Sequence, residues 1–294
     1  MADLHQLVDH LQQQTGLELA NCAFTLLGGG DINTAYKLQT PQRSWFIKIN
    51  QASMLDMFAA EAAGLQELAK AGQVKVPEVV CYGSFQQYAY LMLEFIALGA
   101  LRGESLVLLG RQLAKQHRQA QTCFGWHCDN TIGSTPQSNR RHDDWLTFWH
   151  QERLSKQLEF ARNKGYVGQL QSKGEKLLVS FGGFFSGYQP VAALLHGDLW
   201  IGNAAADKQG NPVIYDPACY YGDREADIAM TELFGGFGPE FYASYQNTYP
   251  LHSGYQVRKQ LYNLYHILNH LNLFGSGYQS QAVSMIERLL AELG

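Results

Sequence analysis

The stretch Leu195-His196-Gly197-Asp198-Leu199-Trp200-Ile201-Gly202-Asn203 places an acid directly after an apolar run and an amide five positions later. A second apolar run, Val213-Ile214-Tyr215, leads to Asp216, thirteen positions after the amide. Phosphoryl transfer from a nucleotide requires a carboxylate that orients the attacking hydroxyl, and oxygen ligands that hold magnesium. The pattern therefore predicts Asp198 as the catalytic base, and Asn203 and Asp216 as ligands of Mg2+.

Two interpretations of these three residues fit the local sequence. Asp and Asn favour turns between buried strands, which would give them a purely structural role. Protein kinases, however, arrange Asp, Asn and a later Asp in this order and at similar spacing. Because all three occur together here, we favour a phosphotransfer centre over three unrelated turns.

The composition is that of a globular chain with room for one large or two modest domains. Its 294 residues are 46% hydrophobic and 16% charged, and the formal net charge of -4 argues against a mainly electrostatic nucleic-acid binder. There is no signal-like N-terminal segment, and no apolar run approaches about 18 residues, so no membrane span is expected. Five scattered cysteines without a CxxC pair fit a reduced, cytoplasmic protein.

The first hundred residues predict a nucleotide-binding region. Apolar residues at helical spacing predict an amphipathic helix over residues 3–15. Strands are expected over residues 23–27, 32–38, 44–49, 76–80 and 88–96, and they would form a mostly antiparallel sheet of about five strands. Gly28, Gly29 and Gly30 interrupt the first two strands. Such a turn is either an ordinary hairpin connection or a place where backbone N–H groups approach phosphates.

Lys48 lies inside an apolar strand, where a lysine needs a partner for its charge. Glu61 lies on the helix expected after this strand and is placed to pair with it, as strand lysine and helix glutamate do in kinases. The alternative is a lysine that reaches water beside a solvated glutamate. In combination with the glycine turn, the pair favours nucleotide phosphates as the ligand.

The composition changes after Ile96, which predicts a boundary between two lobes. Residues 1–96 would form the nucleotide-binding lobe, and residues 97–294 the catalytic and substrate-binding lobe. Glu94, Phe95 and Ile96 would be the hinge, whose backbone can hydrogen-bond adenine. The alternative is a strand end that contacts no ligand.

The second lobe is expected to be mainly helical. Its segment 123–137 is rich in turn formers yet carries aromatic residues, so it either packs as an ordered loop or lines a polar substrate site. Asp227, near the start of a helix, either caps that helix or turns inward to hold the catalytic loop. His266 and His270 are four positions apart without a third metal ligand, so packing is favoured over metal binding.

Four segments resemble the fructosamine kinase (ketosamine 3-kinase) family, within the aminoglycoside and choline kinase-like phosphotransferases. They are residues 58–65, 129–137, 195–203 and 216–230, so the likeness spans nearly the whole chain. The resemblance implies an α+β, bilobal protein kinase-like fold with a small antiparallel-sheet N-terminal lobe and a mainly helical C-terminal lobe. It also implies phosphorylation of the 3-hydroxyl of a ketosamine, dependent on ATP and Mg2+, in deglycation repair.

The resemblance also assigns residues. Lys48 and Glu61 would form the phosphate-binding pair, Asp198 would be the base, and Trp200 would lie beside the substrate sugar. Further substrate contacts are expected from the polar segment of the second lobe, namely Asp129, Asn130, Thr135 and Gln137. The substrate would be a free ketosamine or a glycated protein, and the oligomeric state stays open.

Two positions depart from the family pattern. Ile201 stands where relatives usually have a small residue, and Asp31 stands where some carry a cysteine, so a redox switch in the glycine turn is not supported. Two alternatives are a kinase for an aminoglycoside or choline-like substrate and a non-catalytic nucleotide-binding regulator. The single acid between residues 129 and 137 disfavours a polycationic aminoglycoside. The intact set of phosphotransfer residues disfavours the regulator.

Overall fold

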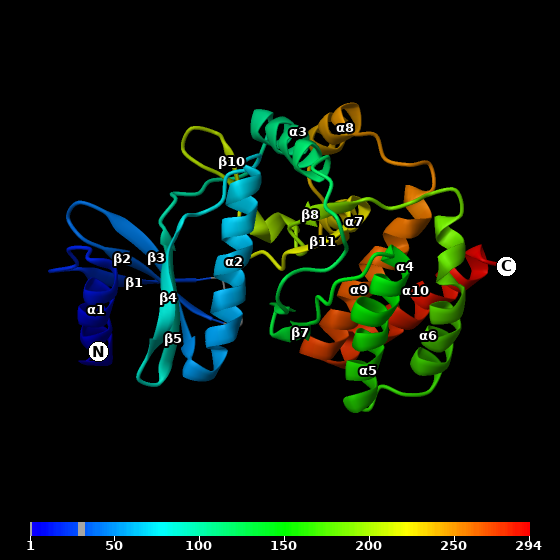
Figure 1. Ribbon diagram of the computed structural model, residues 1–294, viewed down its shortest axis with the longest axis horizontal. Helices are drawn as coiled ribbons and strands as arrows, with labels where there is room; N and C mark the ends of the chain where they lie inside the picture. Colours follow the sequence, from blue (N-terminus) through cyan, green and yellow to red (C-terminus); the bar gives the residue numbers. More distant parts are fainter. Residues whose placement is uncertain (1, 29–32) are drawn as a thin grey trace.

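The computed structural model describes residues 2–28 and 33–294, with Ala2 and Asp3 described by their backbone alone. Over these residues the chain forms a sheet-bearing N-terminal lobe, from α1 to β5, and a mainly helical C-terminal lobe, from α3 onward (Figure 1). This α+β architecture confirms the predicted fold class. The boundary predicted at residue 96 falls in the connection between the two lobes and stays a prediction.

The N-terminal lobe is built on one antiparallel sheet with the strand order β1-β2-β3-β5-β4. The helix α1 (Ala2–Thr15) lies on one side of the sheet and α2 (Leu55–Ala71) on the other, next to the C-terminal lobe (Figure 1). The one-turn helix η1 joins the third strand to α2. The bounds are β1 (Ala23–Leu27), β2 (Thr34–Gln39), β3 (Ser44–Gln51), η1 (Ala52–Met54), β4 (Val79–Phe85) and β5 (Tyr88–Glu94).

Alternation along β3 decides which way Lys48 faces. Successive strand side chains point to opposite faces. Trp45, Ile47 and Ile49 belong to the apolar cluster under α1, whereas Phe46 packs with the cluster under α2. Lys48 therefore shares the α2 face with Phe46, which brings it to the side where Glu61 is located.

Two predicted strands have different bounds in the structure. The strand expected at residues 76–80 begins only at Val79, because Pro77 has no backbone N–H to donate to a neighbouring strand. The strand expected at residues 88–96 ends at Glu94. The second predicted strand is described from Thr34 onward, and Ile32 lies outside the described residues. The helix predicted at residues 3–15 is confirmed.

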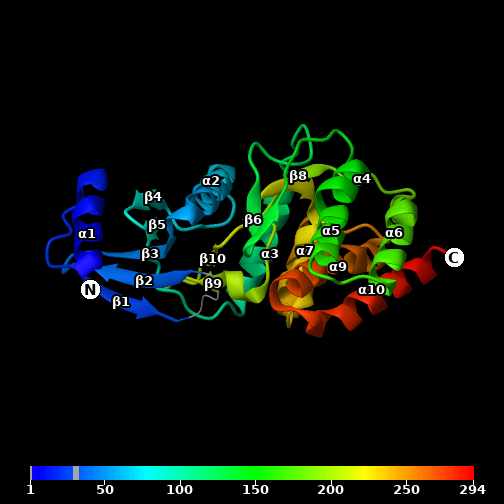
Figure 2. The same cartoon turned by 90° about the horizontal axis from the view of Figure 1, so that it is seen from below.

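The C-terminal lobe surrounds the long helix α9, which packs against α7, α10 and α5. The lobe also contains three two-stranded ribbons, β6–β7, β8–β11 and β9–β10, of which β9–β10 lies next to the N-terminal lobe (Figure 2). The helices are α3 (Glu104–His117), α4 (Trp145–Phe148), the π-helical η2 (Trp149–Leu154), α5 (Ser155–Asn163), α6 (Gln169–Ser180), η3 (Phe181–Phe185), η4 (Ile201–Asn203), α7 (Arg224–Leu233), α8 (Pro239–Thr248), α9 (Tyr255–Phe274), η5 (Ser276–Tyr278) and α10 (Gln279–Glu292). The short strands are β6 (Asn130–Ile132), β7 (Thr135–Gln137), β8 (Ala192–Leu195), β9 (Ala204–Ala206), β10 (Pro212–Ile214) and β11 (Tyr220–Asp223).

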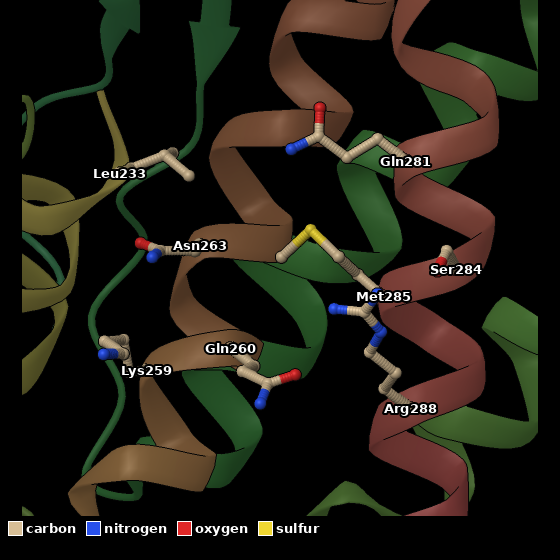
Figure 3. A pocket seen from close by; sticks show the side chains of 8 residues that line it. All are labelled: Leu233, Lys259, Gln260, Asn263, Gln281, Ser284, Met285 and Arg288. Atoms are coloured by element: carbon tan, nitrogen blue, oxygen red, sulfur yellow. The ribbon is translucent and has the colours of Figure 1, made fainter. Parts of the chain in front are cut away.

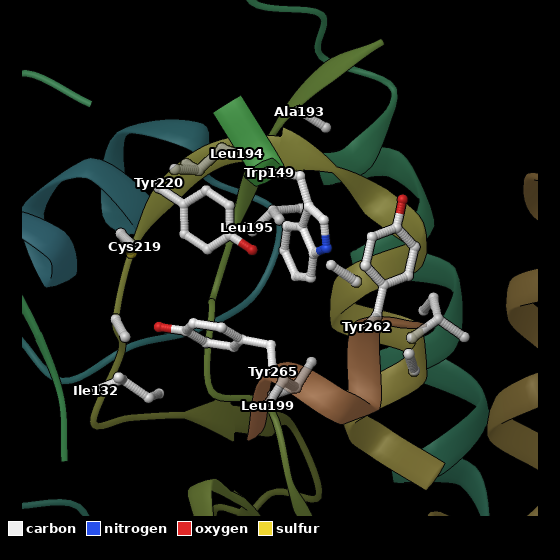
Figure 4. Packing of buried hydrophobic residues seen from close by; sticks show 14 of the residues in the cluster. Ile132, Trp149, Ala193, Leu194, Leu195, Leu199, Cys219, Tyr220, Tyr262 and Tyr265 are labelled. Carbon is white, nitrogen blue, oxygen red and sulfur yellow. The ribbon is translucent and has the colours of Figure 1, made fainter. Parts of the chain in front are cut away.

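A buried aromatic cluster supports the loop that follows β8. Trp149, Tyr262 and Tyr265 pack together beneath this loop, and Leu195 and Leu199 insert into the same cluster (Figure 4). Both leucines are fully buried. Because the two leucines flank Asp198 on either side, their burial holds the loop in place.

Candidate active site

The loop after β8 adopts a backbone that only glycine permits at residue 197. Gly197 has a φ of +82°, and a Cβ there would overlap the carbonyl oxygen of Ala218. The carbonyl of His196 accepts a hydrogen bond from the N–H of Ala218 at 2.8 Å. This close approach brings the loop that carries Asp198 next to the segment that follows Asp216.

Asp198 and Asn203 lie together, as their spacing predicts. Nδ2 of Asn203 donates to the backbone carbonyl of Asp198 at 2.9 Å and to its carboxylate at 3.2 Å. Burial raises the pKa of Asp198 to about 7, the negative charge of Asp216 adds to the effect, and the bond from Asn203 opposes it. A carboxylate with this environment is suited to accept a proton near neutral pH.

Lys48 is buried and has two acidic partners. Its ammonium group lies 2.7 Å from a carboxylate oxygen of Glu61 and also bonds the carboxylate of Asp216. The Lys48–Glu61 pairing predicted from the sequence is thus present, and Asp216 joins it. Burial acts to lower the pKa of Lys48, but the charges of Asp216 and Glu61 outweigh it and raise the pKa, so the lysine stays a cation.

Asp216 lies in an unusual backbone conformation. It follows β10 by two residues and has a φ of +57°, in the left-handed region that Asp tolerates better than most residues. Its side chain is 46% exposed, whereas that of Lys48 is 8% exposed. Strained backbone of this kind is concentrated at functional sites. The carboxylate therefore reaches from the C-terminal lobe to the buried lysine while one side stays open to solvent.

His196 links the two segments of this site. Its Nε2 donates to the carbonyl of Tyr215 at 3.0 Å, and its Nδ1 accepts from the N–H of Asp198 at 3.3 Å. Burial lowers the pKa of His196, which favours the neutral ring that this pattern requires. His196 is not among the residues predicted for the site from the sequence, although its position inside an apolar run was an available signal.

The side chain of Asp227 points inward to the catalytic loop, which decides between the two roles that the sequence left open. Its carboxylate accepts from the N–H of His196 at 2.7 Å and from the N–H of Gly197 at 2.9 Å. The start of α7 is instead capped by Asp223, whose carboxylate accepts from the N–H of Glu225 at 3.0 Å. The interpretation of Asp227 as a helix cap is therefore wrong.

A second buried histidine supports Asp227. His117, on α3, lies 3.3 Å from the carboxylate of Asp227 through Nε2 and 2.9 Å from the hydroxyl of Tyr245 through Nδ1. Arg224 donates to the same hydroxyl at 3.1 Å, so the phenolic proton is directed to Nδ1 and Nε2 carries the proton that faces Asp227. His117 is not among the residues predicted for the site from the sequence.

The polar segment at residues 129–137 forms an ordered hairpin, β6–β7. Asn130 donates to the carbonyl of Cys219 at 2.8 Å, and Gln137 donates to that of Ala218 at 3.2 Å. Asp129 accepts from the N–H of Asn139 at 2.7 Å, and Thr135 is buried. These groups hold the hairpin against the chain just after Asp216. Their substrate-binding role stays a prediction.

Trp200 lies at the edge of the site, and its ring packs over Gly202. A Cβ at residue 202 would overlap the Cη2 and Cζ2 atoms of the Trp200 ring, so the indole lies directly over the glycine. Trp200 remains 38% exposed, and Ile201 beside it is 37% exposed. The ring edge approaches Phe234, with centroids 6.3 Å apart.

The glycine turn and the hinge are described only in part. Gly28 is exposed at the end of β1, and Gly29, Gly30 and Asp31 lie outside the described residues. In the hinge, the N–H of Glu94 donates to the carbonyl of Glu78 at 2.8 Å. Contacts between the hinge and adenine stay a prediction. Because the N–H of Glu94 already has a partner, this prediction concerns chiefly the backbone of Phe95 and Ile96.

A cavity of about 450 Å³ lies away from these residues, between the end of α7, α9 and α10 (Figure 3). It is lined by Leu233, Lys259, Gln260, Asn263, Gln281, Ser284, Met285 and Arg288. None of the residues predicted for phosphoryl transfer borders it. In the described part of the chain, no three His, Cys, Asp or Glu side chains form a metal cluster, and His270 bonds the backbone of His266 instead.

The fold and this arrangement of an ion-paired strand lysine, an Asp–Asn loop and a later Asp define the class: an ATP-dependent phosphotransferase with a protein kinase-like fold. The crystal structure of a thermostable mutant of aminoglycoside phosphotransferase APH(4)-Ia shares this fold with a TM-score of 0.64, at 13% identity, over 97% of this chain and 98% of that one.

The chain belongs to the fructosamine kinase family, whose sequence signature matches residues 4–292. It is 43% identical to a probable ketoamine kinase of Synechocystis over 97% of this chain and 96% of the relative. It is also 43% identical to the chloroplastic protein-ribulosamine 3-kinase of Arabidopsis thaliana, over 91% of this chain and 82% of the relative. The crystal structure of a fructosamine-3-kinase homologue from Haemophilus somnus matches with a TM-score of 0.88, at 30% identity, over 97% and 96%.

Proposed function

We propose that this protein is a ketosamine 3-kinase, which transfers the γ-phosphoryl group of ATP to the 3-hydroxyl of a fructosamine or ribulosamine. The proposal extends to this chain the activity for which its relatives are named. The observation that carries it is the buried Lys48, paired with Glu61 and Asp216, beside the Asp198–Asn203 pair. In this proposal Lys48 is the cation that binds the phosphates, and Asp198 is the proton acceptor.

The residues present suit a magnesium ion. Nδ2 of Asn203 donates to Asp198, while the amide oxygen of Asn203 has lone pairs and can serve as a ligand. The carboxylate of Asp216 is half exposed. Oxygen ligands of this kind are those that Mg2+ prefers. We assign the ion to Asn203 and Asp216. When bound, Mg2+ would neutralise charge on the phosphate oxygens.

In the proposed reaction, Asp198 accepts the proton of the 3-hydroxyl as that oxygen bonds to the γ-phosphorus. The bond from the γ-phosphorus to the bridging oxygen breaks, and ADP leaves. Lys48 holds the phosphates, and Glu61 keeps Lys48 charged and oriented. Backbone groups of the glycine turn, Gly28, Gly29 and Gly30, would cover the phosphates, and the hinge would hold adenine.

Asp227 is assigned a positioning role, because it is buried and accepts hydrogen bonds from the backbone of the catalytic loop. Trp200 is placed beside the sugar, and the β6–β7 hairpin supports the substrate side through Asn130 and Gln137. The substrate would be a ketosamine, free or attached to a protein, and the reaction would be a step in cytoplasmic deglycation. No helix in the described residues is long and apolar enough to cross a membrane.

The deciding experiment offers the protein ATP and Mg2+ with fructosamines, ribulosamines, aminoglycosides, choline and free sugars, and follows ADP release. Ketosamine phosphorylation, with 31P NMR placing the product phosphate on the 3-oxygen, would support the proposal. Asp198→Asn should remove most turnover while ATP still binds. Phosphorylation of aminoglycosides or choline alone would favour the alternative small-molecule kinase, and ATP binding without any turnover would favour a non-catalytic regulator.

A further inference from the structure

Gln137, the last residue of β7, is a buried amide that contacts the chain after Asp216. It is 2% exposed, whereas Pro136 beside it is exposed. Its Nε2 donates one hydrogen bond to the backbone carbonyl of Ala218 at 3.2 Å and one to Oδ1 of Asn130 at 2.8 Å. Both N–H groups of the amide are thus used inside the protein. A buried amide whose two donors are already engaged has neither of them to offer to a substrate.

The amide oxygen of Gln137 is engaged as well. The hydroxyl of Tyr265 donates to Oε1 of Gln137 at 2.7 Å. Tyr265 lies on α9 and is buried in the same aromatic cluster as Leu199 (Figure 4). Because this hydroxyl holds the oxygen end of the amide, the nitrogen end is left to face the carbonyl of Ala218.

The direction of these hydrogen bonds is set by a buried arginine. Arg153, on the π-helical η2, is fully buried and donates through Nη2 to Oδ1 of Asn139 at 2.7 Å. A guanidinium group only donates, so the amide nitrogen of Asn139 must face the other way, and it donates to Oδ1 of Asn130 at 2.9 Å. Oδ1 of Asn130 is therefore an acceptor. The group that Gln137 presents to it must then be a donor.

The amide nitrogen of Asn130 completes this chain of hydrogen bonds. It donates to the carbonyl of Cys219 at 2.8 Å, next to the carbonyl of Ala218 that Gln137 holds. A backbone carbonyl only accepts, so the direction required at this end agrees with the direction imposed by Arg153. Reversal of one amide would place two acceptors or two donors against each other at a buried position, which is costly. The two carbonyls are therefore held in one arrangement.

The peptide of Ala218 in turn abuts the catalytic loop. A Cβ added at Gly197 would overlap the carbonyl oxygen of Ala218, and the N–H of Ala218 donates to the carbonyl of His196 at 2.8 Å. His196 and Gly197 directly precede Asp198. Ala218 itself follows Asp216 by two residues. A displacement of this one peptide would therefore act on the proposed base and on the proposed magnesium ligand together.

We propose that Gln137 is a positioning residue of the phosphotransfer site and that it acts through the peptide of Ala218. This peptide keeps Asp198 and Asp216 in the arrangement that the reaction requires. The inference rests on the proposed kinase activity and gives the buried amide of the β6–β7 hairpin a role in it. Because other groups bind the ketosamine, the loss of Gln137 affects turnover and leaves the affinity for the sugar.

The test uses the full-length protein and two substitutions that remove different hydrogen bonds. Gln137→Met keeps the length of the side chain but has no N–H for Ala218, and Tyr265→Phe removes only the hydroxyl that orients Gln137. Gln13→Met is the matched control, because Gln13 is exposed on α1 in the other lobe. We would measure kcat and KM with ATP, Mg2+ and either fructosyl-lysine or ribulosyl-lysine. Thermal unfolding midpoints show whether each variant is folded.

We expect Gln137→Met to lower kcat by about tenfold, which corresponds to about 1.4 kcal/mol and to the contribution of one buried hydrogen bond. KM for the ketosamine should change by less than about twofold. Tyr265→Phe should lower kcat by about threefold and should add little to Gln137→Met in the double variant, because both changes act on one amide. Gln13→Met should change neither kcat nor KM.

Two results would overturn the proposal. A rise in ketosamine KM of about fivefold or more with kcat retained would make Gln137 a substrate contact. A lower unfolding midpoint with kcat and KM unchanged would limit Gln137 to a role in stability. If Gln137→Met does not fold, the same comparison of kcat, KM and unfolding midpoint in Tyr265→Phe decides between these outcomes.

Failure of the proposed function would give a different result, because the unaltered protein would then phosphorylate neither ketosamine. Calorimetric titration of ATP binding at increasing Mg2+ concentration needs no ketosamine and would test Gln137 in that case. A higher half-saturating Mg2+ concentration in Gln137→Met than in the unaltered protein and Gln13→Met would support the positioning of Asp216. An unchanged concentration would refute it.

Discussion

The carboxylate of Asp227 accepts a hydrogen bond from the backbone N–H of His196, 31 positions earlier in the chain, at 2.7 Å. A second bond, from the N–H of Gly197, joins the other carboxylate oxygen. Both residues precede Asp198 directly. The position of the proposed base therefore depends on a buried side chain that is distant in the sequence.

Asp227→Asn should destabilise the protein and lower turnover together. Asn has only one acceptor oxygen, so one of the two buried N–H groups loses its partner, at a cost of about 2 kcal/mol. Urea unfolding and kcat would be measured on the same preparations. Asp143→Asn, an exposed substitution of the same kind, is the control. Unchanged kcat in Asp227→Asn would contradict the positioning role.

His117 provides a prediction that separates two neutral replacements. Gln is long enough to keep an N–H donor near Asp227, whereas Asn places its amide about one bond short of it. His117→Gln should therefore retain more activity than His117→Asn, by roughly tenfold if one charge-assisted hydrogen bond is at stake. Steady-state kcat for both variants tests this. Equal kcat for the two variants would show that the hydrogen bond from Nε2 of His117 to Asp227 does not contribute to turnover.

Gly202→Ala should displace the indole of Trp200 without touching Asp198 or Asn203. The added methyl overlaps the ring, so the ring must move off the loop. We expect a rise in substrate KM of roughly fivefold with a smaller change in kcat. Because both changes act on one contact, Gly202→Ala should add little to Trp200→Ala. Additive effects in the double variant would disprove the connection.

Lys48→Met should leave two carboxylates, Glu61 and Asp216, without their cation. We expect kcat/KM for ATP to fall by roughly a hundredfold or more, because a charge aimed at the phosphates is lost. Lys70→Met, at a side chain that is 76% exposed, is the matched control and should behave as the unaltered protein. An unchanged KM and kcat in Lys48→Met would remove Lys48 from the phosphate site.

Stability should depend on pH through His266. Burial lowers the pKa of His266 to about 3, with His270 adding to the effect, whereas the ordinary value is 6.5. Between these values the unfolded chain binds the extra proton, so the folded state loses stability as the pH falls, by up to about 1.4 kcal/mol per pH unit. Urea unfolding at about pH 7.5 and about pH 5.5 should show a smaller difference in His266→Gln than in the unaltered protein. The same difference in both proteins would refute this.

Local patterns were sufficient to predict the α+β fold, the five-stranded sheet and the pairing of Lys48 with Glu61. Strand alternation and helix periodicity depend on near neighbours, and those are visible in a sequence. The family assignment is confirmed as well, because the residues around Asp198 are closely spaced and specific. Strand ends were less predictable, as Pro77 shows.

Contacts that depend on tertiary packing were not predictable. Asp216 reaches Lys48 across 168 positions, and His117 reaches Asp227 across 110. Nothing in the local sequence around His117 distinguishes it from an ordinary helix residue. In the same way, the bonds from Gln137 and Asn130 to the chain after Asp216 arise only once the hairpin has docked.

The helix α2 contacts three different parts of the site along one side of its length. Glu61 bonds Lys48, a Cβ added at Gly64 would lie 3.3 Å from Pro217 and Cys219, and Glu67 accepts a hydrogen bond from the hydroxyl of Tyr221 at 2.7 Å. A helix turns as one rigid body, so a rotation of α2 would break these contacts at the same time rather than one by one. The Lys48–Glu61 pair and the packing of α2 on the segment after Asp216 therefore depend on one orientation of this helix.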